Sequence, residues 1–504
     1  MSVGARARRL TYLVHRWTGM GGCLLMVLWF VSGVVMLYVG YPKLTPWERL
    51  GALPALSATQ CCLPLDVALA SSGVHLPAQS MTLTSIRGQP HFLIRDHNGA
   101  YRAINARTAK LAGEVDAAAA QDAAVAFMPA GTASYDGLVN EDRWTHSGSL
   151  NAHRPLHVVR MQGEQPATLY ISSTTGQVVM DAPLSQQRWN YVGAWLHWLY
   201  MFRFQSTDPV WSWLVIVLSA VATVSAITGL CVGLWRWRFS GRYKSGSRTP
   251  YRAPWMWAHH ITGLLFAGFV FTWIFSGLMS MNPLGVFSAR GEPPIMILYH
   301  GGAPGVSGQL GDAQGVVARL HEQGFAVVEM EWRRLKGRPY ILARNGLGES
   351  RLVLDDGEGG LQIRERWAEA DVLRAAAQLF PYQISDSQLL TQYDNYYYGR
   401  QPEAMNGSTE RRLPALRVDF DDPGQTRAYI DLHTGDVAAT LDGRERAGRW
   451  LFNFLHSWDT PGMLSAAVWR DIVLILLSLG GLLVSVSGVV IAWNRLRLWL
   501  KVLR

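Results

Sequence analysis

The chain has 504 residues, a formal net charge of +9 and a hydrophobic fraction of 49%, and it contains 21 tryptophans. This length is more than a single domain usually uses. An overall hydropathy near neutral predicts that membrane-embedded and water-soluble parts alternate. The net positive charge does not indicate a nucleic-acid partner or an acidic substrate, because the basic residues gather at the ends of apolar runs.

Four apolar runs are long enough to cross a bilayer, since each exceeds the roughly 20 residues that a ~30 Å hydrocarbon core requires. The first is predicted to be an uncleaved anchor, because its apolar stretch is too long for a signal peptide and no small-residue cleavage site follows. The predicted parts in chain order are a basic N-terminus (1–17), a first span (18–40), an exported segment (41–209), a second span (210–235), a basic loop (236–258), a third span (259–281), an exported segment (282–468), a fourth span (469–493) and a tail (494–504).

Clusters of Lys and Arg predict the orientation of the spans. They precede the first span, fill the link between the second and third, and follow the fourth, so four spans bring all three clusters to one side. An excess of Lys and Arg marks the cytoplasmic side, which predicts a multi-pass protein of the bacterial inner membrane with both termini in the cytoplasm. The clusters are Arg6, Arg8, Arg9 and Arg16, then Arg236, Arg238, Arg242, Lys244, Arg248 and Arg252, then Arg495, Arg497, Lys501 and Arg504.

The four cysteines predict little cross-linking. Cys23 and Cys231 lie inside apolar runs and are expected to be small core residues. Cys61 and Cys62 are adjacent in the first exported segment, and neighbouring cysteines rarely pair with each other, so their role stays open. The sequence contains no CxxCH, which excludes covalent attachment of a c-type haem.

An internal repeat runs through the chain. The stretch HRWTGMGGCLLMVLWFVSG from His15 resembles HHITGLLFAGFVFTWIFSG from His259, with a constant offset of 244 residues. In the exported segments, YISSTTGQVV from Tyr170 resembles YIDLHTGDVA from Tyr429, with an offset of 259 that also relates His197 to His456. Each copy is expected to be a strand that ends in a Thr-Gly turn, where glycine supplies a positive φ.

Both halves enter and leave the membrane in the same sense, which predicts a parallel repeat about an axis along the membrane normal. Such an axis brings His15 opposite His259 at the cytoplasmic surface and His197 opposite His456 at the outer surface. Two opposed imidazoles suit both axial positions of a haem, so the chain is expected to hold two b-type haems. His260 is the alternative to His259, but it aligns with Arg16 rather than with His15.

Other candidate residues have simpler interpretations. His146, His153 and His157 form a cluster that could bind a metal ion, but they lack a short ligand spacing and counterparts in the second half, so a solvated surface is expected. Trp29 and Trp273 lie 14 residues beyond their histidines, about 21 Å along a helix, which suggests packing near the outer haem or plain helix packing. No strand–GxGxxG–helix context indicates a nucleotide.

The motifs HRWTG, LH and YID..TG.V resemble the PepSY-associated transmembrane helix family over nearly the whole chain. Iron-regulated members look like inner-membrane ferric-siderophore reductases with two b-type haems on four helices. The resemblance implies that His15, His197, His259 and His456 are the axial ligands and that the exported segments are PepSY-like α/β modules. This chain departs from shorter members in its longer exported segments, where substrate choice should lie.

Together these patterns predict a fold class, an integral membrane α-helical protein with four transmembrane helices as a parallel internal repeat and two exported α/β segments. The predicted function is electron transfer through two bis-histidine haems that reduces a periplasmic ferric siderophore and releases Fe(II). Iron with two axial histidines keeps no open position and passes electrons. The donor is expected to be a cytoplasmic protein or a quinol, since no flavin or nicotinamide motif is visible.

Three alternatives share parts of this pattern. A quinol- or ascorbate-linked cytochrome with another periplasmic acceptor, such as copper, has the same haem features. A haem-free PepSY module that binds or restrains a partner needs none of the four histidines. A secondary transporter also uses parallel repeats, but its helices are polar or broken at mid-membrane, and these helices are not.

Overall fold

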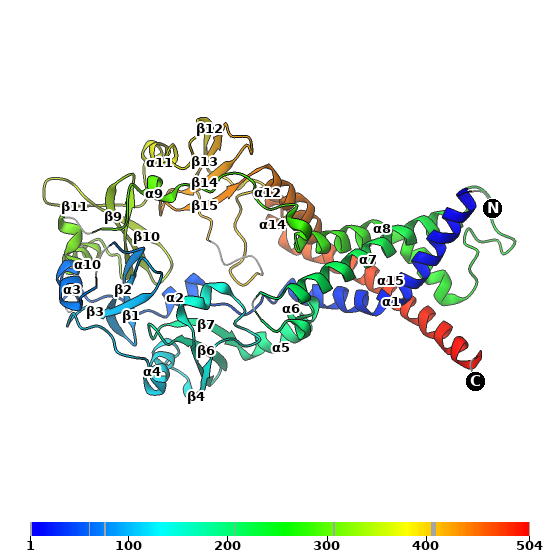
Figure 1. Cartoon of the computed structure of the whole chain (residues 1–504), viewed down its shortest axis with the longest axis horizontal. Coiled ribbons are helices and arrows are strands. Elements are labelled where there is room, and N and C mark those ends of the chain that lie inside the picture. The colour runs from blue at the N-terminus through cyan, green and yellow to red at the C-terminus, as the bar shows by residue number, and fades with distance from the viewer. Residues whose placement is uncertain are drawn as a thin grey trace. The chain divides into compact units, whose positions relative to one another are not determined.

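The computed structural model describes residues 3–59, 61–74, 77–205, 207–305, 308–404 and 410–502. The chain divides into two compact units (Figure 1). The helical unit joins Met1–Gly40, Arg188–Ala289 and Arg444–Arg504, and the sheet unit joins Tyr41–Gln187 and Arg290–Gly443. Each unit is therefore assembled from both halves of the sequence.

Four long helices dominate the helical unit. They are α1 (Val3–Met36), α7 (Pro209–Arg236), α8 (Pro254–Ser280) and α15 (Ala467–Val502), and all four are long and apolar enough to cross a membrane. Helices α1 and α8 each pack against both α7 and α15, so α1 and α8 occupy diagonal corners of the bundle. The prediction of four spans is confirmed, although α1 and α15 continue as helices through the basic residues that were expected to flank them.

The outer surfaces of these helices are apolar. Only 11–33% of the most apolar window of each helix is buried inside the protein, and exposed side chains include Leu24, Val217, Leu265 and Leu483. Apolar surface of this extent requires an apolar surrounding, while each helix satisfies its own backbone hydrogen bonds. The chain is therefore a multi-pass membrane protein.

The basic clusters meet at one end of the helical unit. Arg8 lies over the ring of Trp235 at 5.2 Å, and Arg236 lies over Tyr12 at 5.0 Å. The start of α1 thus contacts the end of α7, and Figure 1 shows both chain ends on this side of the bundle. The expectation that the clusters share one side holds for the described residues. Arg504 lies outside them.

Short elements connect the long helices to the sheet unit. They are α5 (Leu184–Val192), α6 (Ala194–His197), η2 (Tyr200–Phe202), η3 (Pro283–Gly285), α12 (Gly443–Gly448), the π-helical η5 (Arg449–Phe454), α13 (Leu455–Ser457) and α14 (Pro461–Ser465). Helix α6 packs against α1, and α13 packs against α8. These two contacts position the second histidine pair.

Large aromatic side chains fill the middle of the bundle. Phe30 and Phe266 lie against Gly481 and Gly480, where an added Cβ would meet their rings at 2.3 Å. Phe30 also contacts the ring of Trp273, with centroids 5.9 Å apart. The two glycines therefore let α15 approach the phenylalanines closely, and a packed apolar layer separates the two ends of the bundle.

The sheet unit is built around a seven-stranded antiparallel sheet with the order β11-β10-β9-β8-β1-β2-β3. The two segments that were predicted to be exported share this sheet, because β1 pairs with β8 in the register Met81↔Trp332, Thr82↔Glu331 and Leu83↔Met330. The strands are β1 (Ser80–Ile86), β2 (Gln89–Arg95), β3 (Tyr101–Asn105), β8 (Val327–Leu335), β9 (Arg338–Asn345), β10 (Ser350–Asp355) and β11 (Leu361–Arg364).

The sheet unit also contains two four-stranded sheets. One consists of β4 (Thr132–Val139), β5 (Leu156–Gln162), β6 (Ala167–Ser172) and β7 (Val178–Pro183). The other consists of β12 (Ile384–Leu390), β13 (Ala415–Phe420), β14 (Arg427–Asp431) and β15 (Val437–Leu441). Both are antiparallel meanders in chain order. The predicted Thr-Gly turns are present after β6 and β14, with φ of +72° at Gly176 and +76° at Gly435.

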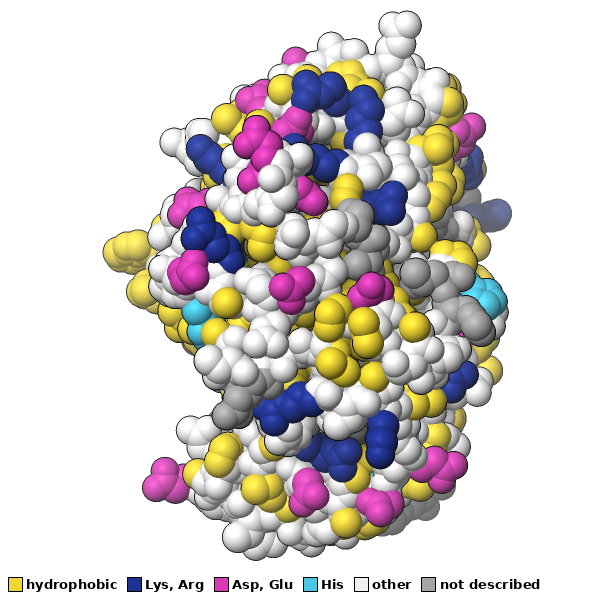
Figure 2. Space-filling view, turned by 90° about the vertical axis from the view of Figure 1, so that its left-hand side faces the viewer, with side chains coloured by type: hydrophobic (Ala, Val, Ile, Leu, Met, Phe, Trp, Pro, Cys, Tyr) yellow, Lys and Arg dark blue, Asp and Glu magenta, His cyan; other side chains and the backbone are white. Residues whose placement is uncertain are grey.

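Helices cover the sheets and form two main apolar cores. One core lies between the seven-stranded sheet and helices α3 and α10, and it includes the sheet residues Phe92 and Trp332. The other includes residues of α9, α11, β13 and β14. Figure 2 shows basic and acidic side chains intermixed on the face that it displays. The helices and 3-10 turns are α2 (Pro46–Gly51), α3 (Leu65–Ser72), α4 (Ala117–Phe127), η1 (Gly148–His153), α9 (Met296–His300), η4 (Gly308–Gly311), α10 (Ala313–Glu322) and α11 (Glu369–Ala376).

Candidate functional site

The inner histidine pair lies in the bundle near its basic end. His15 is in α1 and His259 is in α8. Their ring centroids are 6.3 Å apart, and the ring planes make an angle of 31°. The two diagonal helices therefore present their histidines to one another, as the sequence predicts.

Main-chain carbonyls determine the tautomer of the inner pair. His15 Nδ1 lies 3.1 Å from the Ser225 carbonyl oxygen. His259 Nδ1 lies 3.1 Å from the Val484 carbonyl oxygen and 3.0 Å from Ser487 Oγ. A carbonyl oxygen only accepts hydrogen bonds, so both imidazoles carry their proton on Nδ1. The lone pair of each ring is then on Nε2, the nitrogen available to a metal ion.

The outer pair is held by two short helices. His197 ends α6 and His456 lies in α13. Their ring centroids are 6.1 Å apart, with an interplanar angle of 74°. The sequence prediction of a second opposed pair is met in the arrangement of these residues. Figure 1 shows α6 at the end of the bundle away from both chain ends.

Buried serines determine the tautomer of the outer pair. Ser32 Oγ is 2.9 Å from His197 Nδ1, and Ser276 Oγ is 2.9 Å from His456 Nδ1. Each hydroxyl donates its own proton to a helix carbonyl, that of Leu28 at 2.6 Å or of Trp273 at 3.0 Å. The hydroxyl oxygen therefore accepts from Nδ1–H, which again leaves the Nε2 lone pair free.

All four Nε2 atoms are without a hydrogen-bond partner among the residues that the structure describes. Metal–imidazole bonds are about 2.0–2.1 Å for zinc, and the ring centre lies about 1 Å behind the bonded nitrogen, so two imidazoles on opposite sides of one metal ion have centroids about 6 Å apart. The observed separations of 6.3 and 6.1 Å match that value. Either pair could therefore hold one metal ion between its two imidazole rings.

A glycine lies beside each ring. Gly229 and Gly488 face His15 and His259, and an added Cβ would meet the nearest ring atom at 2.6 Å and 3.6 Å, respectively. At the outer pair, Gly33 faces His197 at 3.9 Å and Gly277 faces His456 at 3.7 Å. Only at Gly229 is the space too small for a methyl group.

His260 is fully engaged elsewhere. Its Nδ1 is 2.7 Å from Thr249 Oγ1, its Nε2 is 2.9 Å from the Gly233 carbonyl oxygen, and its side chain is buried. Both ring nitrogens thus bind protein groups, so the ring has no free lone pair for a metal ion. The structure favours His259 over His260 as the member of the inner pair.

The two tryptophans contact the outer pair differently. Trp29 Nε1 donates to the His197 carbonyl oxygen at 2.9 Å, so this residue does pack beside the outer histidine. Trp273 Nε1 is buried and has no partner among the described atoms. It packs against Phe30 instead, which is the helix-packing interpretation.

The histidine cluster of the first exported segment does not converge. His146 pairs with Glu141, His153 Nδ1 is 3.0 Å from Ser172 Oγ, and His157 Nδ1 is 2.9 Å from the Tyr135 hydroxyl. The described residues contain no group of three potential metal ligands. The expectation of a solvated surface is wrong for His157, which is buried in β5. Burial, together with the positive charge of Arg95, lowers the pKa of His153 to about 4.

Sequence reasoning missed part of the site. Ser225, Gly229 and Gly488 contact the inner histidines but were not singled out. The spacing of 259 residues that relates His197 to His456 also relates Gly229 to Gly488. Applying that spacing to the second and fourth spans would have found them.

The fold and the site define a multi-pass membrane protein with a four-helix bundle, two opposed histidine pairs and an α/β unit. The model of the PepSY-associated TM region matches residues 12–321, and the chain belongs to this family. The matched range includes His15, His197 and His259. No curated protein shows significant similarity to the chain.

Proposed function

We propose that the chain carries electrons across the membrane through two b-type haems, one held by His15 and His259 and the other by His197 and His456. The geometry of the two pairs supports the proposal. In each histidine Nδ1 is hydrogen-bonded to protein and Nε2 is free, and the ring centroids of each pair are 6.3 or 6.1 Å apart, which leaves room for one metal ion between them. Bound haem would supply one-electron iron chemistry, and two axial histidines favour electron transfer over oxygen binding.

The protein's own contribution is to hold the four imidazoles ready. The Nδ1 partners orient the rings and make the nitrogen that faces a metal ion more basic, a role typical of groups behind metal-bound histidines. Ser32 is 17 residues beyond His15 in α1, about 25 Å along the helix. The two pairs therefore span most of a ~30 Å hydrocarbon core.

The internal repeat supports the pairing. The inner contacts Ser225 and Val484, and the outer contacts Ser32 and Ser276, keep the spacings of 259 and 244 residues found in the sequence. In the sheet unit, the β1–β8 register is symmetric about Thr82 and Glu331. We infer a parallel repeat whose axis passes between the members of each pair.

Orientation follows from the basic end of the bundle. The inner pair lies at that end, which the positive-inside rule assigns to the cytoplasm. We infer an inner-membrane protein with cytoplasmic termini, an exported sheet unit and electron flow from the inner to the outer pair. The donor is then a cytoplasmic protein or a membrane quinol.

The proposed acceptor is a ferric siderophore. The sheet unit is the part large enough to hold a bulky chelate, and reduction of Fe(III) to Fe(II) weakens its binding by the hard oxygen ligands of such a molecule. The chain would then act as an oxidoreductase that releases iron in the periplasm. Family membership supports a membrane role, and the acceptor itself rests on the size of the exported segments.

The test uses full-length protein in oriented proteoliposomes, reduced with dithionite and mixed by stopped flow with a ferric siderophore on the sheet-unit side. We expect reoxidation of the haem spectrum, slowed strongly by His197→Ala and not by His153→Ala. Reoxidation by Cu(II) or a quinone but by no ferric chelate would overturn the siderophore assignment and favour another cytochrome. A protein without haem would overturn electron transfer and favour a PepSY binding module.

A further inference from the structure

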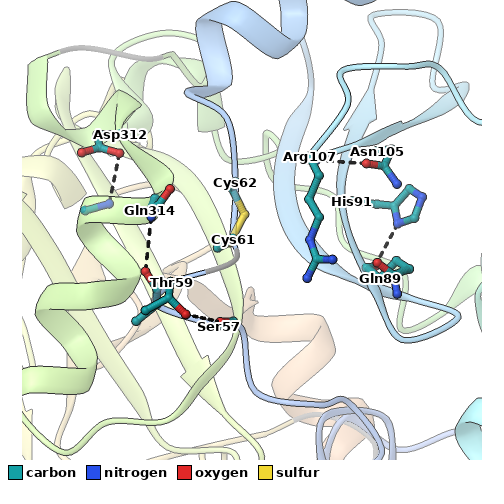
Figure 3. Close-up of a disulfide and its surroundings, with 12 residues drawn as sticks. Ser57, Thr59, Cys61, Cys62, Gln89, His91, Asn105, Arg107, Asp312 and Gln314 are labelled. Atoms are coloured by element: carbon teal, nitrogen blue, oxygen red, sulfur yellow. Dashed lines mark hydrogen bonds between the residues drawn. A yellow bond between two sulfur atoms is a disulfide. The ribbon is translucent and has the colours of Figure 1, made fainter.

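Cys61 and Cys62 form a disulfide between adjacent residues in the sheet unit. The sequence left the role of these neighbours open, and the structure pairs them although adjacent cysteines rarely pair. The bond lies in the segment that leads into α3, and Figure 3 shows both sulfur atoms on the same side of this segment. Gln314 of α10 donates to the Ala58 carbonyl oxygen at 3.4 Å, which attaches the segment to the helix beside it.

The disulfide is poorly suited to stabilising the fold. A cross-link stabilises a protein mainly by closing a loop in the unfolded chain, and the effect grows with loop length. The sequence separation here is 1, so almost no loop is closed. The bond therefore calls for a chemical rather than a structural explanation.

The second half of the chain builds the same place without cysteine. The β1–β8 register is symmetric about Thr82 and Glu331, 249 residues apart. With that spacing, α3 in the first half corresponds to α10 in the second half, and the two cysteines correspond to Leu310 and Gly311. Leu310 corresponds to Cys61 and Gly311 to Cys62, and both are buried, so an apolar side chain and a glycine satisfy the packing at this position of the second half.

The two sulfur-bearing residues differ in access. Cys62 is 4% exposed and belongs to the same buried core as Leu65 and Leu310, while Cys61 is only partly buried and packs against this core. A thiolate arriving from solvent therefore reaches Cys61 first. The better-buried Cys62 sulfur is then the leaving group.

We propose that Cys61–Cys62 is a thiol–disulfide exchange site for a dithiol reductant. A thiolate of the reductant attacks Cys61 Sγ, the Cys61–Cys62 bond breaks, and the electron pair leaves on Cys62 Sγ, which takes up a proton. The second thiol of the reductant then attacks its own sulfur in the mixed disulfide and releases Cys61 as a thiol. The pair gains two electrons and two protons, and the dithiol becomes a disulfide.

Opening the bond should change only the local chain. The Leu56 amide donates to the Val327 carbonyl oxygen at 2.8 Å, and the Leu63 amide donates to the Ala106 carbonyl oxygen at 2.8 Å. These bonds tie one end of the segment to β8 and the other to the residue that follows β3. The exchange site is thus independent of the proposed haems and leaves the surrounding fold in place.

The test treats full-length protein in detergent with dithiothreitol, blocks thiols with an alkylating reagent and maps the peptide that contains both cysteines. We expect double alkylation under native conditions with no change in the melting temperature. Exchange of the reductant for oxidised dithiothreitol should restore the bond, because the reverse exchange returns two electrons and two protons to the reagent. The matched control is the double variant Cys61→Leu/Cys62→Gly, which introduces the residues found at the equivalent positions of the second half. Its melting temperature should equal that of the wild-type protein.

Single variants test the direction of attack. In Cys62→Ser, the remaining Cys61 thiol should react with a disulfide reagent roughly tenfold faster than the Cys62 thiol in Cys61→Ser, because exposure controls access. Equal or reversed rates would overturn the assignment. The exchange site itself would be overturned by alkylation without reductant, by a bond that opens only on denaturation, or by a double variant that melts several degrees lower.

Discussion

The two histidine pairs reach similar separations by different means. The inner histidines lie in membrane-spanning helices, and main-chain carbonyls accept their Nδ1 protons. The outer histidines lie in the short helices α6 and α13, and serine hydroxyls accept their protons. Each inner Nδ1 therefore has a main-chain acceptor that no substitution removes, although Ser487 Oγ also contacts His259. The outer Nδ1 atoms bond instead to the side chains of Ser32 and Ser276.

Removal of a ligand should have the largest effect. His15→Ala or His259→Ala should abolish the inner haem and keep the outer one, and His197→Ala or His456→Ala should do the reverse, because one imidazole cannot fill two axial positions. Each variant should fall from two haems per chain to one in a pyridine-haemochrome assay. The control is His260→Ala, which should retain both; loss of haem there but not in His259→Ala would show that the wrong neighbour was chosen.

A methyl group beside His15 should selectively damage the inner pair. The Cβ of Gly229→Ala would meet His15 Cε1 at 2.6 Å, while that of Gly488→Ala would lie an ordinary 3.6 Å from His259 Cε1. We expect Gly229→Ala to lower inner-haem content and Gly488→Ala to leave it unchanged. Haem spectra of the two proteins, purified in parallel, provide the comparison, and equal behaviour would contradict the inner geometry.

Loss of the serine hydroxyls should distinguish the two pairs. Ser32→Ala or Ser276→Ala removes the hydroxyl that accepts from Nδ1–H, and loss of such a partner typically weakens metal binding about 10–100-fold. Ser487→Ala should have little effect, because His259 keeps the Val484 carbonyl. Haem retention during competition with apomyoglobin measures the difference; an equal loss in all three variants would remove the contrast.

The ring angles should produce a smaller, spectroscopic difference. The mutual rotation of two axial imidazole planes determines how strongly the d orbitals of low-spin ferric iron are split. The outer angle of 74° should therefore give a more anisotropic electron paramagnetic resonance signal than the inner angle of 31°. His197→Ala should remove the more anisotropic signal and His15→Ala the other, and the opposite assignment would contradict the geometry.

The sequence predicts the parts that repeat locally. The spans follow from hydropathy, and the four histidines follow from two constant spacings, because each copy preserves the ligand together with its helix. The Thr-Gly turns at Gly176 and Gly435 could likewise be predicted, since positive φ favours glycine.

Pairings between distant segments could not be predicted in the same way. The exported segments were expected as separate modules, and nothing in the alternation of β1 or β8 indicates that Met81 lies beside Trp332. The carbonyl contacts of Ser225 and Val484 were invisible because a main-chain oxygen has no sequence signature. The Cys61–Cys62 bond went against the general rarity of adjacent pairs.

The haem content and spin state of the purified full-length protein, produced in haem-replete cells, test the central claim most directly. Two b-type haems per chain, both low-spin in the oxidised and reduced states, are the predicted result, because each of the two pairs supplies both axial ligands. A colourless protein, a single haem that survives every one of the four histidine substitutions, or high-spin iron would contradict it.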